Sequence, residues 1–333
     1  MKLTTTADVL DLLGTCLVSA AVAAALESQL FWRLAEQPQT VGSVSEALGI
    51  PLKRCHHWLE LLAGLGLLQR RDEAYVPSPT ARAAILDAYS PETWALLAEE
   101  SRERYPAGQD LAHHIGRPGS VWEAQGRRPP DYVAQMAQSP ERARRFTRML
   151  YEIHRPLAAE LAETLDMTGV RRLMDLGGGS GVVSLALLNR HPDLTAVVVD
   201  IANVCVAGRE ICATSPAAER LAYHAADFLQ DELPSGFDMV LECDVGIYGE
   251  ALFRKLRTVL NPGGRLVIVD ELAHPARVPS LSRLIHAFRA SLADPDSTTP
   301  TAAEVQSLLT QAGFRLVPEQ ILSRGEVVIQ AHN

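Results

Sequence analysis

The sequence has few aromatic residues, an odd number of cysteines and no excess of positive charge. Aromatic side chains make up 5% of its 333 residues, and the five cysteines are scattered without a Cys-x-x-Cys pair. This pattern fits reduced thiols in the cytoplasm better than it fits a disulfide framework. The formal net charge of −9 argues against a chain that binds nucleic acid or an anionic membrane as its main partner.

The sequence also lacks a convincing membrane-spanning or signal segment. Its most apolar uncharged run extends from Leu12 to Leu26, which is 15 residues, whereas a spanning helix needs about 20. Asp8 and Asp11 lie where the apolar part of a signal peptide would begin. We therefore expect a buried, alanine-rich helix here and no membrane partner.

The length corresponds to about two domains at ~150 residues each, and the first of these, residues 1–95, has a winged-helix pattern. Ser43 and Glu46 have the spacing of a capping box that opens a short helix. A second helix is predicted near 52–64, and residues 67–76 have the pattern of a small hairpin. The pattern predicts helix, turn, helix and a two-stranded wing.

Charge argues against DNA binding by this winged helix. Residues 1–95 contain 7 Lys or Arg against 10 Asp or Glu, so they offer no basic face for a phosphate backbone. The long apolar first helix has more apolar surface than an isolated winged helix needs. We expect it to form a homodimer contact.

The rest of the chain divides into two parts. Residues 96–165 are expected to form connecting helices that cover the substrate pocket. Residues 166–333 alternate between strand and helix patterns, which predicts a Rossmann-like α/β fold with a parallel sheet. The last two strands are joined by a tight turn at 323–325, which predicts an antiparallel terminal strand. The strands are expected at 172–176, 196–200, 222–226, 239–242, 266–270, 314–321 and 326–331.

The strongest motif is a glycine-rich turn directly after the first of these strands. It has the pattern Asp-x-Gly-x-Gly-x-Gly, formed by Asp175, Gly177, Gly179 and Gly181. Glycines suit such a turn because a ligand approaches the backbone closely and some positions need a positive φ. A dinucleotide site would instead read Gly-x-Gly-x-x-Gly, and an acid at 175 suits a cofactor with a cationic amino-acid end better than a pyrophosphate.

Two further acids follow the next two strands. Asp200 lies 19 residues after Gly181, where a carboxylate can accept hydrogen bonds from both hydroxyls of a ribose. Asp227 and Phe228 follow the third strand, where an acid can meet an adenine amino group and a ring can stack on the base. Together these residues predict an adenosine-containing cofactor.

These motifs resemble those of the class I S-adenosylmethionine (SAM)-dependent methyltransferases. With the N-terminal half included, the chain is similar to the bacterial and plant small-molecule O-methyltransferases, whose winged-helix domain forms an intertwined homodimer. The resemblance implies SAM as cofactor and S-adenosylhomocysteine (SAH) as product. It also places Ile201 and the backbone of Cys243 beside the cofactor. Further matching segments are 146–149, 191–192, 226–228 and 312–314.

The sequence departs from this family at the expected catalytic base. The family typically reads Val-Leu-His-Asp-Trp after the fourth strand, whereas this chain has Ile247 at the histidine position, followed by Tyr248. The family's supporting acid is retained as Asp270, and a second acid is replaced by Thr299. The acceptor could therefore already be nucleophilic, as a thiolate, an amine, an acidic phenol or an enol carbon.

Another residue could instead supply the base. His154 and Asp244 are the catalytic candidates, because they lie near the substrate pocket and the cofactor by motif position. Residues expected to line the acceptor pocket are Met149, Ile247, Tyr248 and His286. The adjacent histidines at 56–57 and 113–114 lack the spacing of a metal site, and no metal is expected.

The sequence thus predicts a cytoplasmic, homodimeric, SAM-dependent methyltransferase of specialised metabolism that acts on a small molecule. The alternatives are a SAM-binding protein with a non-methylating role and a winged-helix regulator that senses SAM.

Overall fold

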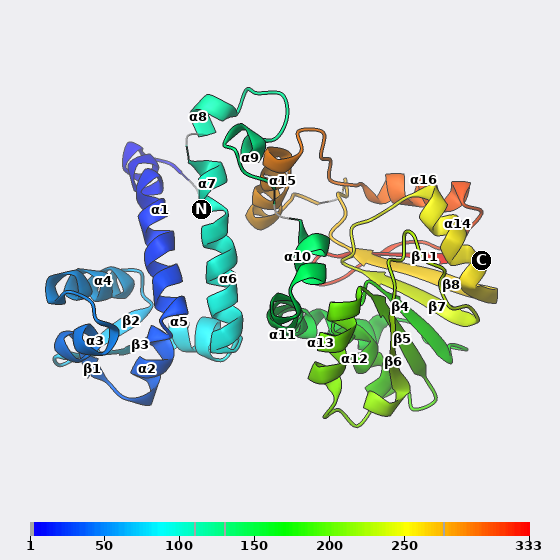
Figure 1. The fold of residues 1–333 in the computed structure, drawn as a ribbon, viewed down its shortest axis with the longest axis horizontal. Coiled ribbons are helices and arrows are strands. Elements are labelled where there is room, and N and C mark those ends of the chain that lie inside the picture. The colour runs from blue at the N-terminus through cyan, green and yellow to red at the C-terminus, as the bar shows by residue number, and fades with distance from the viewer. Residues whose placement is uncertain (1–2, 110, 130, 276) are drawn as a thin grey trace. The chain divides into compact units, whose positions relative to one another are not determined.

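The computed structural model describes residues 3–109, 111–129, 131–275 and 277–333, and the chain divides into two compact units (Figure 1). The first is Met1–Gln109 and the second is Asp110–Asn333. Helix α6 (Pro91–Glu103) packs along α1 (Thr6–Glu27) and belongs to the first unit. An ion pair of 2.6 Å between Arg102 and Glu27 joins these two helices. The first unit therefore extends beyond the boundary expected after residue 95.

The first unit contains a winged helix, as the sequence predicts. Its helix-turn-helix is formed by α3 and α4, and its wing by β2 and β3, which pair antiparallel. A short β1 completes a sheet with the order β1-β3-β2. The elements besides α1 and α6 are α2 (Leu30–Glu36), β1 (Gln39–Thr40), α3 (Val41–Leu48), α4 (Leu52–Gly64), β2 (Leu68–Arg71), β3 (Ala74–Pro77), α5 (Pro79–Ala81), a π-helical turn (Arg82–Leu86) and α7 (Tyr105–Gly108).

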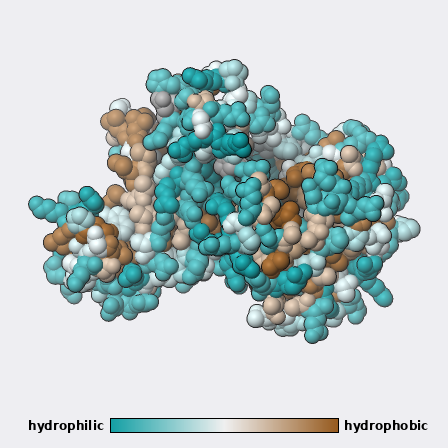
Figure 2. Space-filling model, in the orientation of Figure 1, coloured by the Kyte–Doolittle hydropathy of each residue, from teal (hydrophilic) through white to brown (hydrophobic). Residues whose placement is uncertain are grey.

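Helix α1 is mostly exposed, which corrects the expectation that it is buried. Only residues near its C-terminal end are buried, where the Nε1 of Trp58 donates to the carbonyl of Ala21 at 3.0 Å. The N-terminal half exposes an apolar stripe, which is visible in Figure 2, formed by Leu10, Leu13 and Leu17. By length and composition alone, α1 could cross a membrane, and within the described ranges it is the only helix that could.

The second unit is built around a sheet with the order β10-β11-β8-β7-β4-β5-β6. The five strands from β4 to β8 are parallel, and β11 pairs antiparallel with β8. Strands β4, β5, β7 and β8 contain long apolar runs because both faces of the sheet are covered here, whereas β6 lies at the edge of the sheet and is more exposed. The strands are β4 (Arg172–Leu176), β5 (Thr195–Asp200), β6 (Leu221–Ala225), β7 (Phe237–Cys243), β8 (Leu260–Asp270), β9 (Arg315–Leu316), β10 (Gln320–Ile321) and β11 (Val327–His332).

Helices cover both faces of this sheet and bury two separate apolar cores (Figure 1). One face packs against α11, α12 and α13, and the other packs against α14 and α16. The helices of the unit are α8 (Leu111–His114), α9 (Val121–Ala124), α10 (Tyr132–Gln138), α11 (Pro140–Thr164), α12 (Val182–Arg190), α13 (Ala202–Cys212), a 3-10 turn (Ala218–Arg220), α14 (Glu250–Val259), α15 (Leu281–Ala293) and α16 (Ala302–Gln311).

Two local expectations change in the structure. The strand expected over 314–321 divides into the short β9 and β10, which flank Pro318, a residue that has no backbone N–H to donate to a sheet. The short helix expected to open at a Ser43–Glu46 capping box instead begins at Val41, where the side chain of Thr40 accepts from the backbone N–H of Ser43 at 3.2 Å. The terminal hairpin forms as predicted, with β10 and β11 joined around Gly325.

Candidate active site

The glycine-rich turn connects β4 to α12 at the carboxyl edge of the sheet. Gly177, Gly179 and Gly181 have φ values of 65°, 56° and 77°, a region that is costly for residues with a Cβ. A Cβ on Gly177 would lie 2.8 Å from a methyl carbon of Val245, so the turn packs closely on the segment after β7. A Cβ on Gly179 would meet no atom within 4 Å. The turn is therefore open above Gly179, where a ligand can approach its backbone.

Asp200, at the end of β5, is hydrogen-bonded to this turn. One carboxylate oxygen accepts from the backbone N–H of Gly179 at 2.9 Å, and the other accepts from that of Ile201 at 2.8 Å. Burial raises the pKa of Asp200 to about 6, although both backbone hydrogen bonds lower it. The structure thus brings together the turn and the acid that the sequence analysis assigned to a ribose.

Asp175 lies beneath the turn rather than on its open side. Its side chain is buried, and one oxygen accepts from the hydroxyl of Ser184 at 2.7 Å. Its other oxygen has no hydrogen-bond partner in the described part of the chain. Burial raises the pKa of Asp175 to about 6. A Cβ on Gly178 would lie 2.4 Å from this carboxyl carbon, so the acid holds the turn in place from below.

An acid lies at or just after the end of each parallel strand. The five are Asp175, Asp200, Asp227, Asp244 and Asp270. Because the carboxyl ends of parallel strands meet at one edge of a sheet, these acids give that edge a negative potential. A cationic ligand with a sulfonium or ammonium group fits this edge better than a pyrophosphate does.

Asp227 and Phe228 lie directly after β6, as predicted. The Asp227 side chain accepts from the backbone N–H of Leu229 at 2.9 Å, which orders the loop. Phe228 is half-buried and packs against the core under α14. The two side chains therefore lie next to each other in the loop that follows the strand beside Asp200.

Helix α10 covers the segment that carries Ile201. Met136 is buried in a small cluster with Ile201, and the side-chain amide of Asn203 donates to the carbonyls of Met136 and Ala137 at 2.9 Å. Burial, followed by the charge of Asp200, raises the pKa of Tyr132. The sequence analysis missed Tyr132 because a tyrosine at a helix start has no motif that would mark it.

His154 and Asp244, the two catalytic candidates, form a contact. The Nε2 atom of His154 lies 3.0 Å from a carboxylate oxygen of Asp244, and Nδ1 lies 2.9 Å from the carbonyl of Leu150. A carbonyl and an ionised carboxylate only accept, so this arrangement favours an imidazolium that donates from both nitrogens. Burial alone would lower the pKa of His154, but Asp244, the Leu150 carbonyl and the charge of Glu326 together raise it.

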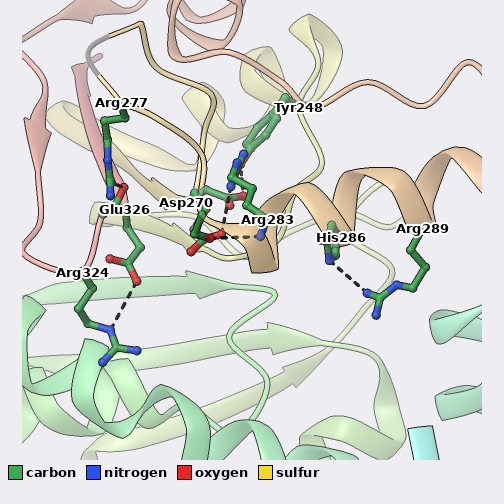
Figure 3. Close-up of polar contacts among 11 residues, drawn as sticks. Tyr248, Asp270, Arg277, Arg283, His286, Arg289, Arg324 and Glu326 are labelled. Carbon is green, nitrogen blue, oxygen red and sulfur yellow. Dashed lines mark hydrogen bonds and ion pairs between the residues drawn. The ribbon is translucent and has the colours of Figure 1, made fainter. Parts of the chain in front are cut away.

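The segment after β7 carries Ile247 and Tyr248, and its two side chains differ in environment. Ile247 is 39% exposed. Tyr248 is half-buried and donates its hydroxyl to a carboxylate oxygen of Asp270, both of which are shown in Figure 3. Burial raises the pKa of both Tyr248 and Asp270. Asp270, which the sequence analysis matched to the family's supporting acid, therefore accepts a hydrogen bond from Tyr248.

Two further groups near this edge have raised pKa values. Glu242 is buried on β7 with both oxygens lacking a partner within the described residues, and burial and the charge of Asp270 raise its pKa well above the usual value. Burial, together with the surrounding acids, raises the pKa of the Cys243 thiol. The sequence pattern gave no sign of the buried Glu242, and the thiol of Cys243 is unsuited to act as a nucleophile.

The remaining two pocket candidates lie on helices that flank the edge. Met149 is buried on α11. His286 is exposed on α15, 3.1 Å from a guanidinium nitrogen of Arg289 (Figure 3). The same helix exposes several apolar side chains, namely Leu281, Leu284, Ile285 and Phe288.

A family model described as an O-methyltransferase domain matches residues 116–315. The chain belongs to the O-methyltransferase family. It is 29% identical over 305 residues to the N,N-dimethyltransferase OxyT of Streptomyces rimosus, a match that covers 89% of this chain and 87% of that protein. It is 30% identical over 253 residues to 3-hydroxy-5-methyl-1-naphthoate 3-O-methyltransferase of Streptomyces sahachiroi, a match that covers 75% of this chain and 72% of that protein.

Among solved structures, human N-acetylserotonin methyltransferase in complex with SAM is similar to this methyltransferase, with a TM-score of 0.80 and 19% sequence identity. The match covers 100% of this chain and 99% of the human chain. The SAM-dependent methyltransferase fold and the cofactor inferred from the sequence are confirmed. The protein is an enzyme that uses SAM and acts on a small molecule.

The affinity for SAM is expected to fall as the pH drops through about 6. Asp175 and Asp200 both have a pKa of about 6, so below this pH they lose the charge that attracts a sulfonium cation. Both pKa values also lie above the unfolded value of ~3.9. Proton binding by these two carboxyl groups therefore stabilises the folded state below pH ~4, and this stabilisation is lost as the pH rises to ~6. Titration calorimetry at pH 5 and pH 8 measures the change in SAM affinity.

The binding of SAH provides the control for this pH effect. SAH lacks the sulfonium charge, so its affinity should change less than that of SAM between the two pH values. Equal changes for both ligands would contradict an electrostatic role of these acids.

Proposed function

We propose that this methyltransferase transfers the methyl group of SAM to a small-molecule acceptor without a histidine general base. The supporting observation is the arrangement around Asp270, which accepts a hydrogen bond from Tyr248, while Ile247 lies at the position where the family has its histidine. Ile247 offers no proton acceptor at that position. His154 is the histidine that contacts Asp244, and both of its ring nitrogens face acceptors.

The residues present at the carboxyl edge fit SAM. The open backbone above Gly179 and the carboxylate of Asp200, which is hydrogen-bonded to that backbone, support this assignment. Asp200 would hold the ribose hydroxyls, and Asp227 with Phe228 would hold the adenine. When bound, SAM supplies an electrophilic methyl group on a positively charged sulfur.

Placement of the acceptor would then provide most of the catalysis. Orientation of two reactants can contribute ~7–11 kcal/mol, whereas a general base typically contributes ~10²–10⁴-fold in rate. A thiolate, an amine, an acidic phenol or an enol carbon needs little or no help from a base. The relatives named above act on nitrogen and on oxygen, and both atoms are therefore included among the acceptors proposed for this enzyme.

His154 and Asp244 would position the segment after β7 rather than accept a proton. Asp244 has a φ of 57°, an unusual conformation for an aspartate. Its backbone N–H donates to the carbonyl of Val269 at 2.9 Å, and its side chain pairs with His154 on α11. The pair thus connects α11 to the segment that carries Ile247 and Tyr248.

Methyl transfer is tested with SAM that carries an isotopically labelled methyl group. The acceptors are 2-naphthol, 2-naphthylamine and 2-naphthalenethiol, which differ only in the acceptor atom. We expect labelled product and an equal amount of SAH with at least one of them. SAM binding without any SAH formation would favour the non-methylating role, and a specific gel shift with genomic DNA fragments would favour the SAM-sensing regulator.

We propose in addition that the enzyme is a cytoplasmic homodimer of specialised metabolism with no membrane or nucleic-acid partner. All five cysteines are free, which suits a reducing compartment. The apolar stripe of α1 is a surface that a second copy of the winged-helix unit could cover. The bacterial relatives named above, which modify elaborate small molecules, support the metabolic setting.

Replacing two leucines of the α1 stripe is expected to abolish the dimer. Leu13 and Leu17 are each 73% exposed, so Leu13→Ser with Leu17→Ser removes apolar contact area without opening the core of the unit. Sedimentation velocity should then report a monomer. Leu316→Ser, at an exposed leucine of the other unit, serves as the control. A double variant that remains a stable dimer would show that the interface lies elsewhere.

A further inference from the structure

A small cavity at one end of the carboxyl edge is lined by three arginines. It has a volume of about 70 Å³ and lies among the segment after β8, the start of α15 and the β10–β11 turn. Arg277 comes from the first of these, Arg283 from the second and Arg324 from the third. Figure 3 shows the three side chains beside Asp270 and Glu326. We call this cavity the arginine pocket.

The three arginines of the pocket differ in their carboxylate partners. Arg283 pairs with Glu271 at 3.1 Å, and Arg324 lies 3.7 Å from Glu326. Arg277 donates to the backbone carbonyl of Gly325, and no carboxylate within the described ranges pairs with it. Arg277 is therefore the one arginine of the pocket without a carboxylate partner in the described part of the chain. The remaining N–H donors of its guanidinium are available to a bound carboxylate.

The chemistry of the pocket favours a carboxylate. Guanidinium groups bind carboxylates through paired N–H donors in a planar, bidentate geometry. Ser280, which also lines the pocket, caps the N-terminus of α15, and the partial positive charge of this helix end adds to the attraction for an anion. His274, which also lines the pocket, pairs with Glu319 at 2.7 Å.

The position of the pocket relative to the glycine-rich turn suits an acceptor. The turn follows β4, whereas the pocket lies beside the ends of β8 and β11, which are two and three strands away. At ~4.8 Å per strand, this separation is about 10–14 Å. An acceptor with one or two fused rings can span such a distance while its opposite end reaches the cofactor side of the edge.

We propose that the arginine pocket binds a carboxylate group of the acceptor, so that the enzyme selects aromatic acids over their uncharged counterparts. This inference rests on the proposed function, because it assigns the acceptor to the same edge of the sheet. The pocket sets the orientation of the acceptor, and the site near β7 and β8 receives its nucleophilic atom.

The test compares the binding of matched acceptor analogues to the enzyme saturated with SAH. The probes are 6-hydroxy-2-naphthoate and its carboxamide, in which the hydroxyl and the acid or amide group lie at opposite ends of the ring system, measured by titration calorimetry. We expect the carboxylate to bind at least ten times more tightly than the carboxamide. Hydrogen bonds between charged groups contribute ~1.5–3 kcal/mol, so Arg277→Gln and Arg283→Gln should each weaken naphthoate binding by about 10–100-fold. Neither substitution should change carboxamide binding by more than about threefold.

Arg254→Gln is the matched control, because Arg254 is an exposed arginine on α14 that pairs with Glu250 outside the pocket. It should leave the affinity for naphthoate unchanged. If the unmodified enzyme binds SAH but binds the carboxylate and the carboxamide equally, the arginine pocket does not select acids and the inference is wrong. The same comparison decides the question if a variant fails to fold. Failure to bind SAH would instead contradict the proposed function.

Discussion

Asp200→Asn is expected to weaken SAM binding by about 100-fold. Each oxygen of Asp200 accepts from a backbone N–H, one from Gly179 and one from Ile201. An asparagine presents an NH₂ group to one of these donors, so that hydrogen bond is lost and the turn is no longer held in place. The ribose hydroxyls also lose a charged acceptor, and a hydrogen bond to a charged group is worth ~1.5–3 kcal/mol.

Calorimetric titration with SAM measures this loss. Asp193→Asn, at an exposed acid in the loop between α12 and β5, is the control and should leave SAM affinity unchanged. The fall in SAM affinity below pH 6 should also become smaller in Asp200→Asn, because one of the two titrating carboxylates is gone. A SAM affinity of Asp200→Asn within threefold of that of the unmodified enzyme would show that Asp200 does not contact the cofactor.

Alanine substitutions at two glycines of the turn are expected to have different consequences. Gly177→Ala places a methyl group 2.8 Å from Val245 in a strained backbone conformation. Gly179→Ala has similar backbone strain but meets no atom within 4 Å. We expect Gly177→Ala to lower the stability of the second unit more than Gly179→Ala does. Its cost is the positive-φ penalty of ~1–2 kcal/mol plus the steric clash with Val245. We expect Gly179→Ala to reduce SAM affinity at least tenfold with a smaller loss of stability.

Thermal unfolding and SAM titration of both variants provide the comparison. The two glycines are matched controls for each other, because both have a positive φ in the same turn. If Gly179→Ala binds SAM normally, the open side of the turn is not where the cofactor lies. If both variants unfold at the same temperature, the packing of Gly177 on Val245 contributes no measurable stability.

The sequence was sufficient to predict the sheet and the cofactor motifs. Strands β4, β5, β7 and β8 are recognisable because buried parallel strands are nearly continuous apolar runs that end in glycine or aspartate. The connection between Asp200 and the turn follows from the same logic, since consecutive strands of a parallel sheet end at one edge. Each of these is a local sequence pattern, and the fold class determines where the pattern lies in the structure.

The polar contacts of the site could not be predicted in this way. His154 and Asp244 are 90 residues apart, and Tyr248 and Asp270 are 22 residues apart. Their contacts depend on side-chain directions at the ends of different elements, which hydrophobic periodicity does not encode. The sequence alone also left the environment of α1 open, because an apolar helix that contacts a second chain and one that is buried in its own core have the same composition.

The pH dependence of methyl transfer tests the central claim most directly. Single-turnover rates are measured from pH 5 to pH 9 with saturating labelled SAM and the naphthol, naphthylamine and naphthalenethiol acceptors. The account predicts that each rate follows the ionisation of its own acceptor and the saturation of SAM, with no further rise near pH ~6.5. A rise near this pH with 2-naphthol that disappears in His154→Gln would show that His154 acts as the base and would contradict the account.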